Sequence, residues 1–470
     1  MNQSDPRRPG NVVLRRSRVR PETVQVSRRR LHVTFHPQLW MVPLAFALII
    51  ALGALLLALP AASEARTWTN GWDALFTATS AVSVTGLVRV DTADHWSGFG
   101  EVVILTLIQA GGLGVTIYAG MLLLIAGRHF GLRGREFFGF ELLSVGERDV
   151  RRLLRRVMIY VAVVEALTFL LLLPWFLDHS DGTGLGVWRA FFHAISAFNN
   201  AGFDIMGGRA SFTGQIASPY LLVVLGLAAL LGSLSFVTVF NLRKRPRWWS
   251  LDTRLVIVGM GALLVLALLL FALGEVQTGR VLDRAGVGDV VANGFFLSVN
   301  RTTGMTTVDM SAIRESTTII VLALMFVGGA STSTASGIKI GTFMVVLIAA
   351  LSSLKRRSRA EAFGREIPEP VILRAVAVVI LGLMTLVLGA WIVSWTDQDA
   401  PFLPLLFEVT SALANVGWSQ GLTAGLSAGG AITLTVLMFI GRLGPLMIAL
   451  SVPERPEVRY RYPREGVRIG

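Results

Sequence analysis

Long apolar segments alternate with short segments of mixed polarity along the whole chain. Apolar runs such as 221–237, 256–271 and 375–392 approach the ~20 residues that a helix needs to cross a bilayer core of roughly 30 Å. The pattern predicts eight spanning helices, at about 39–60, 99–127, 154–177, 217–241, 254–275, 316–353, 370–396 and 429–451. Four shorter helices are expected at 71–84, 187–199, 287–300 and 403–415. About 12 helical residues cover only roughly 18 Å, so each short segment must enter and leave the membrane on one side.

A glycine closes each short segment, and a serine precedes that glycine by six residues. The glycines are Gly86, Gly202, Gly304 and Gly417, and the serines are Ser80, Ser196, Ser298 and Ser411. Ordinary turn or helix-packing glycines are the alternative interpretation, but four copies with one offset favour a fourfold repeated unit. We therefore divide the chain into a basic tail expected to be disordered and cytoplasmic (1–37), repeats 1 to 4 (38–127, 128–241, 242–354 and 355–451) and a cytoplasmic C-terminal segment (452–470).

Composition and charge decide the class of protein. The chain is 53% hydrophobic and 16% charged, with a mean hydropathy of +0.62, which a soluble protein cannot bury. The net charge of +13 suggests nucleic acid, but most Lys and Arg lie in five segments: 1–31, 127–157, 242–254, 354–374 and 452–470. This alternation follows the positive-inside rule. It predicts a multi-pass protein of the cell membrane with both termini in the cytoplasm, and no nucleic-acid partner.

Enzymatic chemistry finds no support in the residue pattern. The chain has no cysteine, no Walker A or HExxH motif, and no plausible Ser/His/Asp arrangement. We expect no enzymatic activity and no covalently bound cofactor. Among polar residues inside apolar segments, Glu165 is expected to pair or pack at an interface and His193 to be a structural histidine.

The glycine-ended segments suit a dehydrated cation. Rings of backbone carbonyls bind such an ion without fixed charge, and glycine permits the backbone conformations that aim them. The short helices would also point their partially negative C-terminal ends at the pore. Asp91, Asp204 and Asp309 follow three of the glycines and form either a negative rim or ordinary solvated positions.

A run of small and hydroxyl residues interrupts the apolar segment 316–353. It is a poor helix and an adaptable loop, and it predicts a gate below the filter; a helix kink in a protein interface is the alternative. The predicted gating loop spans 328–341, and its gate residues are Gly328, Gly329, Ser331, Thr332, Ser333, Thr334, Ser336 and Gly337. Lys339 follows, where snorkelling to the cytoplasmic surface fits best, and Arg442 lies within the last apolar segment, where a charge needs a partner or a water path.

From about residue 38 onward, these motifs resemble the Trk/Ktr/HKT superfamily of potassium transporters. The similar stretches are 76–87 with Val90-Asp91-Thr92, 108–114, 192–203, 301–304, 328–339 and 439–445. One spanning helix precedes the first loop, which makes the match closest to the Ktr-type membrane subunit. The resemblance implies an all-α membrane fold with four M1–pore loop–M2 repeats around a pseudo-fourfold pore. It also implies a homodimer with one pore per subunit, the terminal segment 452–470 at the dimer interface, and a cytoplasmic nucleotide-binding ring that opens the pore. Loops 127–157 and 354–374 are where we would dock that ring.

By position, the resemblance assigns K⁺ to the backbone carbonyls of a selectivity filter. Its residues are Ser83, Val84, Thr85, Gly86, Asn199, Asn200, Ala201, Gly202, Arg301, Thr302, Thr303, Gly304, Ala414, Asn415, Val416 and Gly417. Arg442 matches an arginine that contacts the gating loop, and is included with Lys339 among the gate residues. This chain has Thr303 where alanine is common and Trp418 where a smaller apolar residue is usual.

Potassium uptake is the leading hypothesis. A sodium- or ammonium-permeable channel of the same architecture and a secondary transporter with inverted repeats are alternatives. A structural or receptor membrane protein would not need four breaks at membrane depth. Sodium as a coupling or activating ion stays open.

Overall fold

The computed structural model describes residues 37–126, 147–207, 211–213, 215–275 and 286–451. The predictions for the two terminal tails and for most of the 127–157 loop lie outside these residues. Apart from one small hairpin, the described elements are helices. Nearly every predicted helix is present within a few residues of its expected bounds, because the apolar runs that drive helix formation here are long and uninterrupted.

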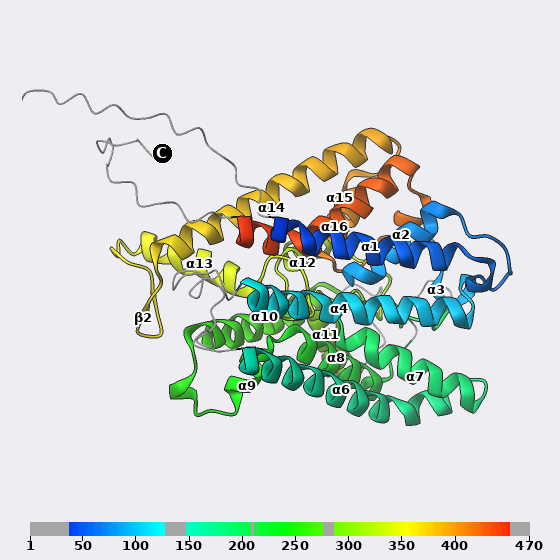
Figure 1. Cartoon of the computed structure of the whole chain (residues 1–470), viewed down its shortest axis with the longest axis horizontal. Coiled ribbons are helices and arrows are strands. Elements are labelled where there is room, and N and C mark those ends of the chain that lie inside the picture. The colour runs from blue at the N-terminus through cyan, green and yellow to red at the C-terminus, as the bar shows by residue number, and fades with distance from the viewer. Residues whose placement is uncertain (1–36, 127–146, 208–210, 214, 276–285, 452–470) are drawn as a thin grey trace, which may run out of the picture. The chain divides into compact units, whose positions relative to one another are not determined.

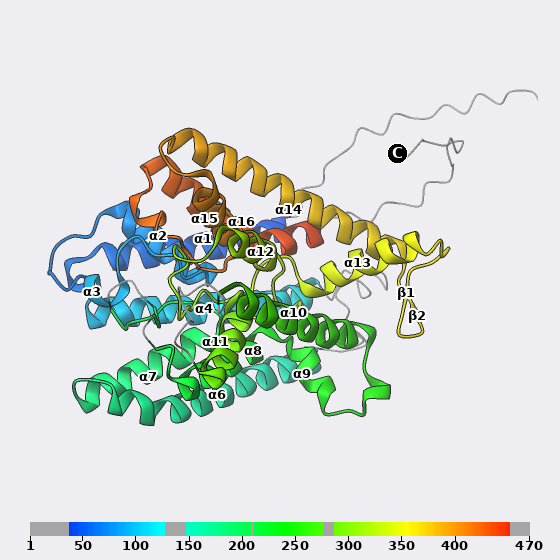
Figure 2. The ribbon, with the colours of Figure 1, turned by 180° about the vertical axis from the view of Figure 1, so that it is seen from behind.

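The long helices run side by side in both views of the ribbon (Figures 1 and 2). They are α1 (Pro37–Ala58), α4 (Gly98–Ala126), α6 (Glu147–Asp178), α10 (Leu251–Glu275), α14 (Glu369–Thr396) and α16 (Ala428–Ser451). Among the described residues, α6, α10 and α14 are long and apolar enough to cross a bilayer by length and composition alone. The bent pair α8 (Pro219–Ser233) and α9 (Phe236–Leu242) adds a fourth. The full set of eight spans stays a prediction.

Four short helices lie where the glycine-ended segments predict them. They are α2 (Gly71–Ser83), α7 (Thr183–Phe198), α11 (Val287–Asn300) and α15 (Phe402–Ala414). Each of these helices packs against the helix that follows the signature glycine of the preceding repeat. Thus α7 packs on α4, α11 on α8 and α15 on α12 (Glu315–Phe326). The set closes on itself, because α2 packs on α16.

Two long segments are broken rather than continuous. The expected helix at 217–241 is not one continuous helix, because α8 and α9 meet at a bend of 103°. The carbonyls of Gly232 and Ser233 at this bend bond to another segment, and the Ser235 side chain caps α9 by accepting from the Thr238 N–H. The second break separates α12 from α13 (Ile340–Leu354), as predicted from its small residues.

The short turns and the hairpin lie at the two ends of the long helices. Turn η1 (Pro60–Ala62) and α3 (Thr92–His95) lie at one end with the α6–α7 connection. At the other end lie α9, η2 (Pro246–Trp248) and an antiparallel hairpin of β1 (Glu361–Ala362) and β2 (Arg365–Glu366) (Figure 1). One further turn, η4 (Thr423–Gly425), precedes α16.

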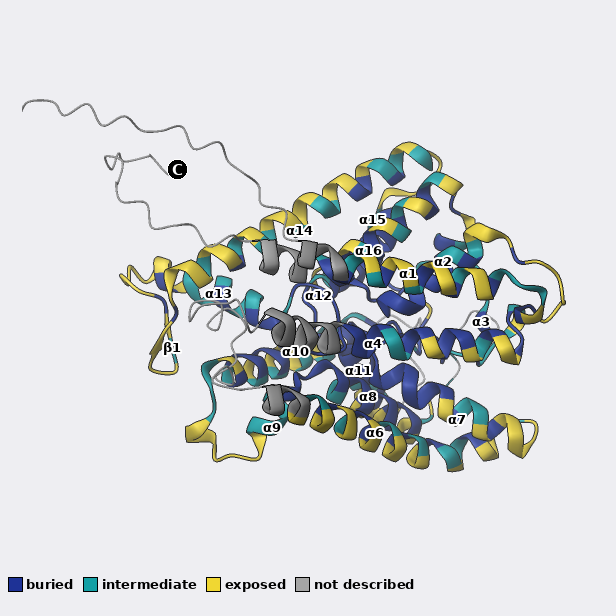
Figure 3. Cartoon of the chain, in the orientation of Figure 1, coloured by how far each residue is buried: buried dark blue, intermediate teal, exposed yellow. Residues whose placement is uncertain are grey.

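The buried residues lie mainly in the short helices and the loops after them, whereas the outer helices are more exposed. In Figure 3 the short helices and the loops after them are mostly dark blue, whereas α14 is exposed along much of its length. Its exposed side chains are large and apolar, for example Met384, Val387 and Trp391. Such a face is stable in lipid and not in water.

Candidate ion pathway

The four signature glycines form a closed ring. All four have left-handed backbone, with φ of +87°, +72°, +86° and +99° for Gly86, Gly202, Gly304 and Gly417. A Cβ on any of them would lie under 3.0 Å from the backbone carbonyl oxygen just before the next glycine in the ring. Those oxygens belong, in the same order, to Ala201, Thr303, Val416 and Thr85, so the fourth loop contacts the first. Only glycine satisfies both the conformation and the close approach.

Three of the loops share one turn, and the repeated serine explains it. Two residues before the glycine, Val84, Asn200 and Asn415 are left-handed, with φ of +58°, +58° and +52°. The next residue donates its N–H to the carbonyl of the signature serine. These bonds are Thr85 to Ser80 (2.8 Å), Ala201 to Ser196 (2.9 Å) and Val416 to Ser411 (2.9 Å). A β-branched residue such as Val84 is strained in this region, and the surrounding packing must hold it there.

The serine hydroxyl has a second role in the first and fourth loops. Ser80 Oγ accepts from the Gly86 N–H at 3.1 Å, and Ser411 Oγ accepts from the Gly417 N–H at 3.0 Å. In the second loop, Ser196 Oγ instead donates to the Phe203 carbonyl at 2.6 Å. In the first and fourth loops the hydroxyl therefore binds the N–H group of the signature glycine.

The third loop is built differently. The N–H groups of Thr303 and Gly304 both donate to the Asn300 carbonyl, at 2.8 and 2.9 Å. The Arg301 side chain is buried and points away from the glycine ring, donating to the Val327 carbonyl with its other amino group 3.6 Å from Met260 Sδ. Of the predicted filter residue Arg301, only the backbone can therefore belong to the pathway.

Side chains tie neighbouring loops together at three of the four junctions. Asn200 Oδ1 accepts from Thr303 Oγ1 at 2.7 Å, joining the second and third loops. Trp418 Nε1 donates to the Met305 carbonyl at 3.1 Å, joining the third and fourth. Asn415 donates to Thr85 Oγ1 at 2.8 Å, joining the fourth and first. Both departures from the family pattern thus form inter-loop hydrogen bonds, which the sequence alone did not reveal.

Glycines in three long helices bring those helices onto the pore helices. A Cβ on Gly111, Gly232 or Gly441 would lie under 3.0 Å from the carbonyl oxygens of Val82, Phe198 and Leu413, respectively. Each of these carbonyls lies four residues before a signature glycine. Gly111 belongs to the glycine-rich stretch 110–114, whose small residues let α4 pack closely on the helix beside it.

The predicted gating segment lies in the α8–α9 break, against the second loop. The Ala330 N–H donates to the Ser233 carbonyl at 2.9 Å, and the Thr334 N–H to the Gly232 carbonyl at 3.1 Å. Thr334 Oγ1 also donates to the Phe198 carbonyl (3.1 Å) and accepts from Asn200 Nδ2 (2.9 Å). The segment therefore contacts the turn of the second loop directly.

Arg442 reaches this segment from α16. Its Nη1 donates to the Thr334 carbonyl and to Ser336 Oγ (2.7 Å), and its Nη2 to the Gly111 carbonyl of α4 (2.8 Å). Snorkelling of Lys339 to the surface is wrong: its Nζ donates to the Ala335 carbonyl at 2.6 Å, inside the gating segment. That carbonyl lies four residues back and is within reach of the folded-over side chain.

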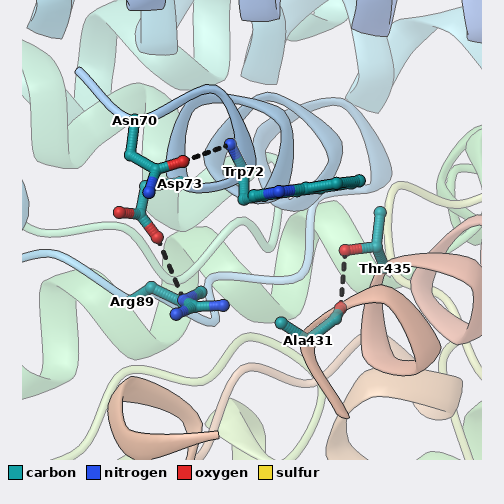
Figure 4. A network of polar contacts seen from close by, with 6 residues as sticks. All are labelled: Asn70, Trp72, Asp73, Arg89, Ala431 and Thr435. Atoms are coloured by element: carbon teal, nitrogen blue, oxygen red, sulfur yellow. Dashed lines mark hydrogen bonds and ion pairs between the residues drawn. The ribbon is translucent and has the colours of Figure 1, made fainter. Parts of the chain in front are cut away.

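An ion pair lies beside the first loop. Arg89, three residues after Gly86, lies 3.0 Å from Asp73 in the first turn of α2 (Figure 4). A cavity of about 290 Å³ adjoins the pair, between Trp72 and the start of α16 (Figure 4).

The three acids proposed for a negative rim all make local turn bonds. Asp91 caps α3, Asp204 accepts from the Met206 N–H, and Asp309 accepts from the Ser311 N–H. Burial, and less so the charge of Asp91, raises the pKa of Asp204 to about 7. The solvated alternative fits the exposed Asp309 but not the buried carboxyl of Asp204.

His193 is structural, as predicted. It is fully buried and stacks on Phe176. Its Nδ1 lies 2.7 Å from the Arg189 carbonyl, and its Nε2 accepts from the Ile205 N–H.

Comparison with known proteins places this geometry among transporters. The family model described as TrkH, cation transport protein, matches residues 45–457. Potassium uptake protein B of the Ktr system of Bacillus subtilis is 35% identical over 91% of this chain and 95% of its own length. The potassium/sodium uptake protein NtpJ of Enterococcus hirae is 32% identical over 92% and 96%. The crystal structure of the potassium transporter TrkH from Vibrio parahaemolyticus matches with a TM-score of 0.69 at 17% identity, covering 91% of this chain and 87% of that one. That likeness confirms the all-α membrane fold.

Proposed function

This chain belongs to the TrkH family of cation transport proteins, and we propose that it is the potassium-conducting subunit of an uptake system in the cell membrane. Relatives with potassium uptake in their names match it over nearly its full length. Family and relatives are transporters, so a catalytic role has no support.

The observation that carries the proposal is the glycine ring. Four loops bring backbone carbonyls of Thr85, Ala201, Thr303 and Val416 to one ring. Carbonyl oxygens replace the hydration shell of a potassium ion without adding fixed charge, so the ion can also leave. The short helices end at this ring, and their C-terminal partial charge favours a cation.

The gating segment 328–341 closes the pathway on the cytoplasmic side in this proposal. Its bonds to α8, to the second loop and to Arg442 support a held, closed arrangement. A cytoplasmic nucleotide-binding ring would release it by docking on loops 127–157 and 354–374, the second of which carries the β1–β2 hairpin. The working unit is a homodimer with cytoplasmic termini.

Sodium permeation is the second candidate, because one relative is named for both potassium and sodium uptake. The hydrogen bonds between loops favour a ring of fixed size, which favours potassium. A secondary transporter built from two inverted repeats fits less well, since the short helices follow one another around a single cycle.

Growth of a bacterium lacking its own potassium uptake systems tests the proposal. The chain is expressed with and without its cognate soluble subunit, in medium limited for potassium. We expect growth to be restored most strongly when both are present. Failure to restore growth under any condition, with the protein present in the membrane, would argue decisively against potassium uptake. Restored growth that is lost when sodium is added would favour the sodium-permeable alternative.

A further inference from the structure

The junction between the first and second loops is closed differently from the other three. Among the residues that the structure describes, no hydrogen bond joins these two loops directly. The long helix α4 lies between them instead. Its Gly111 packs on the Val82 carbonyl of the first pore helix, and its Gly112 packs on the Asn199 side chain of the second loop.

A cluster of two amides and a carboxylate fills this position. Asn199 Nδ2 donates to Gln109 Oε1 of α4 at 2.7 Å and to Glu165 Oε1 of α6 at 3.1 Å. Gln109 Nε2 donates to both carboxylate oxygens of Glu165, at 3.0 and 3.2 Å. The carboxylate therefore accepts from both amides and joins three separate elements: α4, α6 and the second loop.

A carboxylate at membrane depth is costly unless it is bonded, and hydrogen bonds to a charged acceptor are roughly twice as strong as neutral ones. Glu165 forms no salt bridge within the described part of the chain, and its carboxylate accepts hydrogen bonds from the two amides. The amide groups fix which atoms of Asn199 face α4. Asn199 is the first residue of the turn that ends at Gly202. Fixing its side chain against α4 therefore fixes the start of this turn.

We propose that Glu165 is a positioning residue for the ion filter, acting through Gln109 and Asn199. It holds the second loop against α4 at the one junction without a direct inter-loop bond. This inference rests on the proposed function, because the readout is ion selectivity. Loss of Glu165 frees Asn199 to rotate, and a ring of variable size discriminates K⁺ from Na⁺ less well.

The test measures K⁺ and Na⁺ fluxes in liposomes that contain the purified full-length protein together with its cognate soluble subunit, per amount of monodisperse protein. We expect Glu165→Ala to retain K⁺ flux but to lower the K⁺/Na⁺ permeability ratio about tenfold. Glu165→Gln keeps one acceptor oxygen and should lower the ratio by about threefold. Thr168→Val, one turn further along α6 and also buried, is the matched control and should leave the ratio unchanged.

A double-mutant cycle separates positioning from general weakening of the fold. Because Glu165 acts through Asn199, the Glu165→Ala change should have no further effect on selectivity in an Asn199→Ala background. Gln109→Leu breaks the same cluster from α4, and replaces Glu165→Ala if that variant does not yield monodisperse protein. An unchanged ratio in the single variants, or fully additive effects in the cycle, would overturn the inference. Absence of K⁺ flux in the unaltered protein with its soluble subunit present would instead refute the proposed function.

Discussion

Replacing Arg442 with alanine should open the pathway in the absence of any cytoplasmic partner. Two bonds of this guanidinium, to the Thr334 carbonyl and Ser336 Oγ, join α16 to the gating segment, and a third anchors it on Gly111. Hydrogen bonds of charged groups contribute ~1.5–3 kcal/mol each. The two bonds to the segment therefore favour the closed arrangement by up to roughly 3–6 kcal/mol.

Only part of that free energy is expected to appear in the variant. Water entering the vacated space bonds to the freed carbonyls, and the cost of burying the cation disappears. Taking half of the total, the closed state loses about 1.5–3 kcal/mol, which corresponds to a roughly 10- to 150-fold shift toward open. Arg442→Lys keeps one charged donor and should leak to an intermediate extent.

The assay is K⁺ efflux from liposomes containing the purified protein without its soluble partner. Arg359→Ala is the control, since this exposed arginine pairs with Glu366 on the β1–β2 hairpin, away from the gating segment. We expect the control to leak as little as the unaltered protein. A folded Arg442→Ala protein with unaltered efflux would refute the argument that this residue holds the segment closed.

Three further substitutions test the mouth, the ring and the packing beneath it. Asp73→Asn removes the ion-pair partner of Arg89. Arg89 lies three residues after Gly86, so the chain places its Cα atom within ~10 Å of the Gly86 Cα atom. The substitution should raise the K⁺ concentration for half-maximal uptake several-fold at low ionic strength and much less at high salt. Trp418→Phe keeps the apolar ring but removes the donor to the Met305 carbonyl, and should lower the K⁺/Na⁺ permeability ratio by about threefold to tenfold. Gly232→Ala forces a methyl group onto the Phe198 carbonyl and should destabilise the protein by ~1–3 kcal/mol or more, measured by thermal unfolding in detergent.

Each of these substitutions has a matched control in the chain. Asp178→Asn removes a highly exposed acid from the end of α6, and a comparable loss of uptake there would contradict a local role for Asp73. Trp391→Phe changes an exposed tryptophan of α14, so an equal change in selectivity would contradict the role of Trp418. Gly261→Ala adds a methyl group where no atom lies within 4 Å, and equal destabilisation would contradict the packing argument.

The sequence predicts the helices well because hydrophobic length and the glycine signature are local properties. It also predicts the position of the α12–α13 break, since Gly328 to Gly337 contains few good helix formers. The bend between α8 and α9 is not predictable in this way. Its segment is apolar throughout, and its Gly232 and Ser233 carbonyls bond to a partner about 100 residues away.

The residues around the ring show the same division between local and distant causes. The turn from the signature serine to its glycine is contained within one loop in three of the four copies, so its spacing is visible in the sequence. The different turn of the third loop is not visible there, because Ser298 keeps the same offset. The orientation of Arg301 and the bond from Trp418 depend on elements from other parts of the chain. In the sequence, Trp418 is only a departure from the family pattern next to a signature glycine. The structure explains it, because its indole N–H donates to the neighbouring loop.

Asn200 links the predicted gating segment to the glycine ring, and under the proposed function this link affects how the pathway opens. Its Nδ2 donates to Thr334 Oγ1, while its Oδ1 accepts from Thr302, Thr303 and Ser233. Withdrawal of the gating segment removes Thr334 and leaves a buried amide donor short of one partner. Such a donor is costly unless water enters or the side chain reorients. Either response acts on the amide that joins the second and third loops, so opening the gate and shaping the ring are not independent events in this fold.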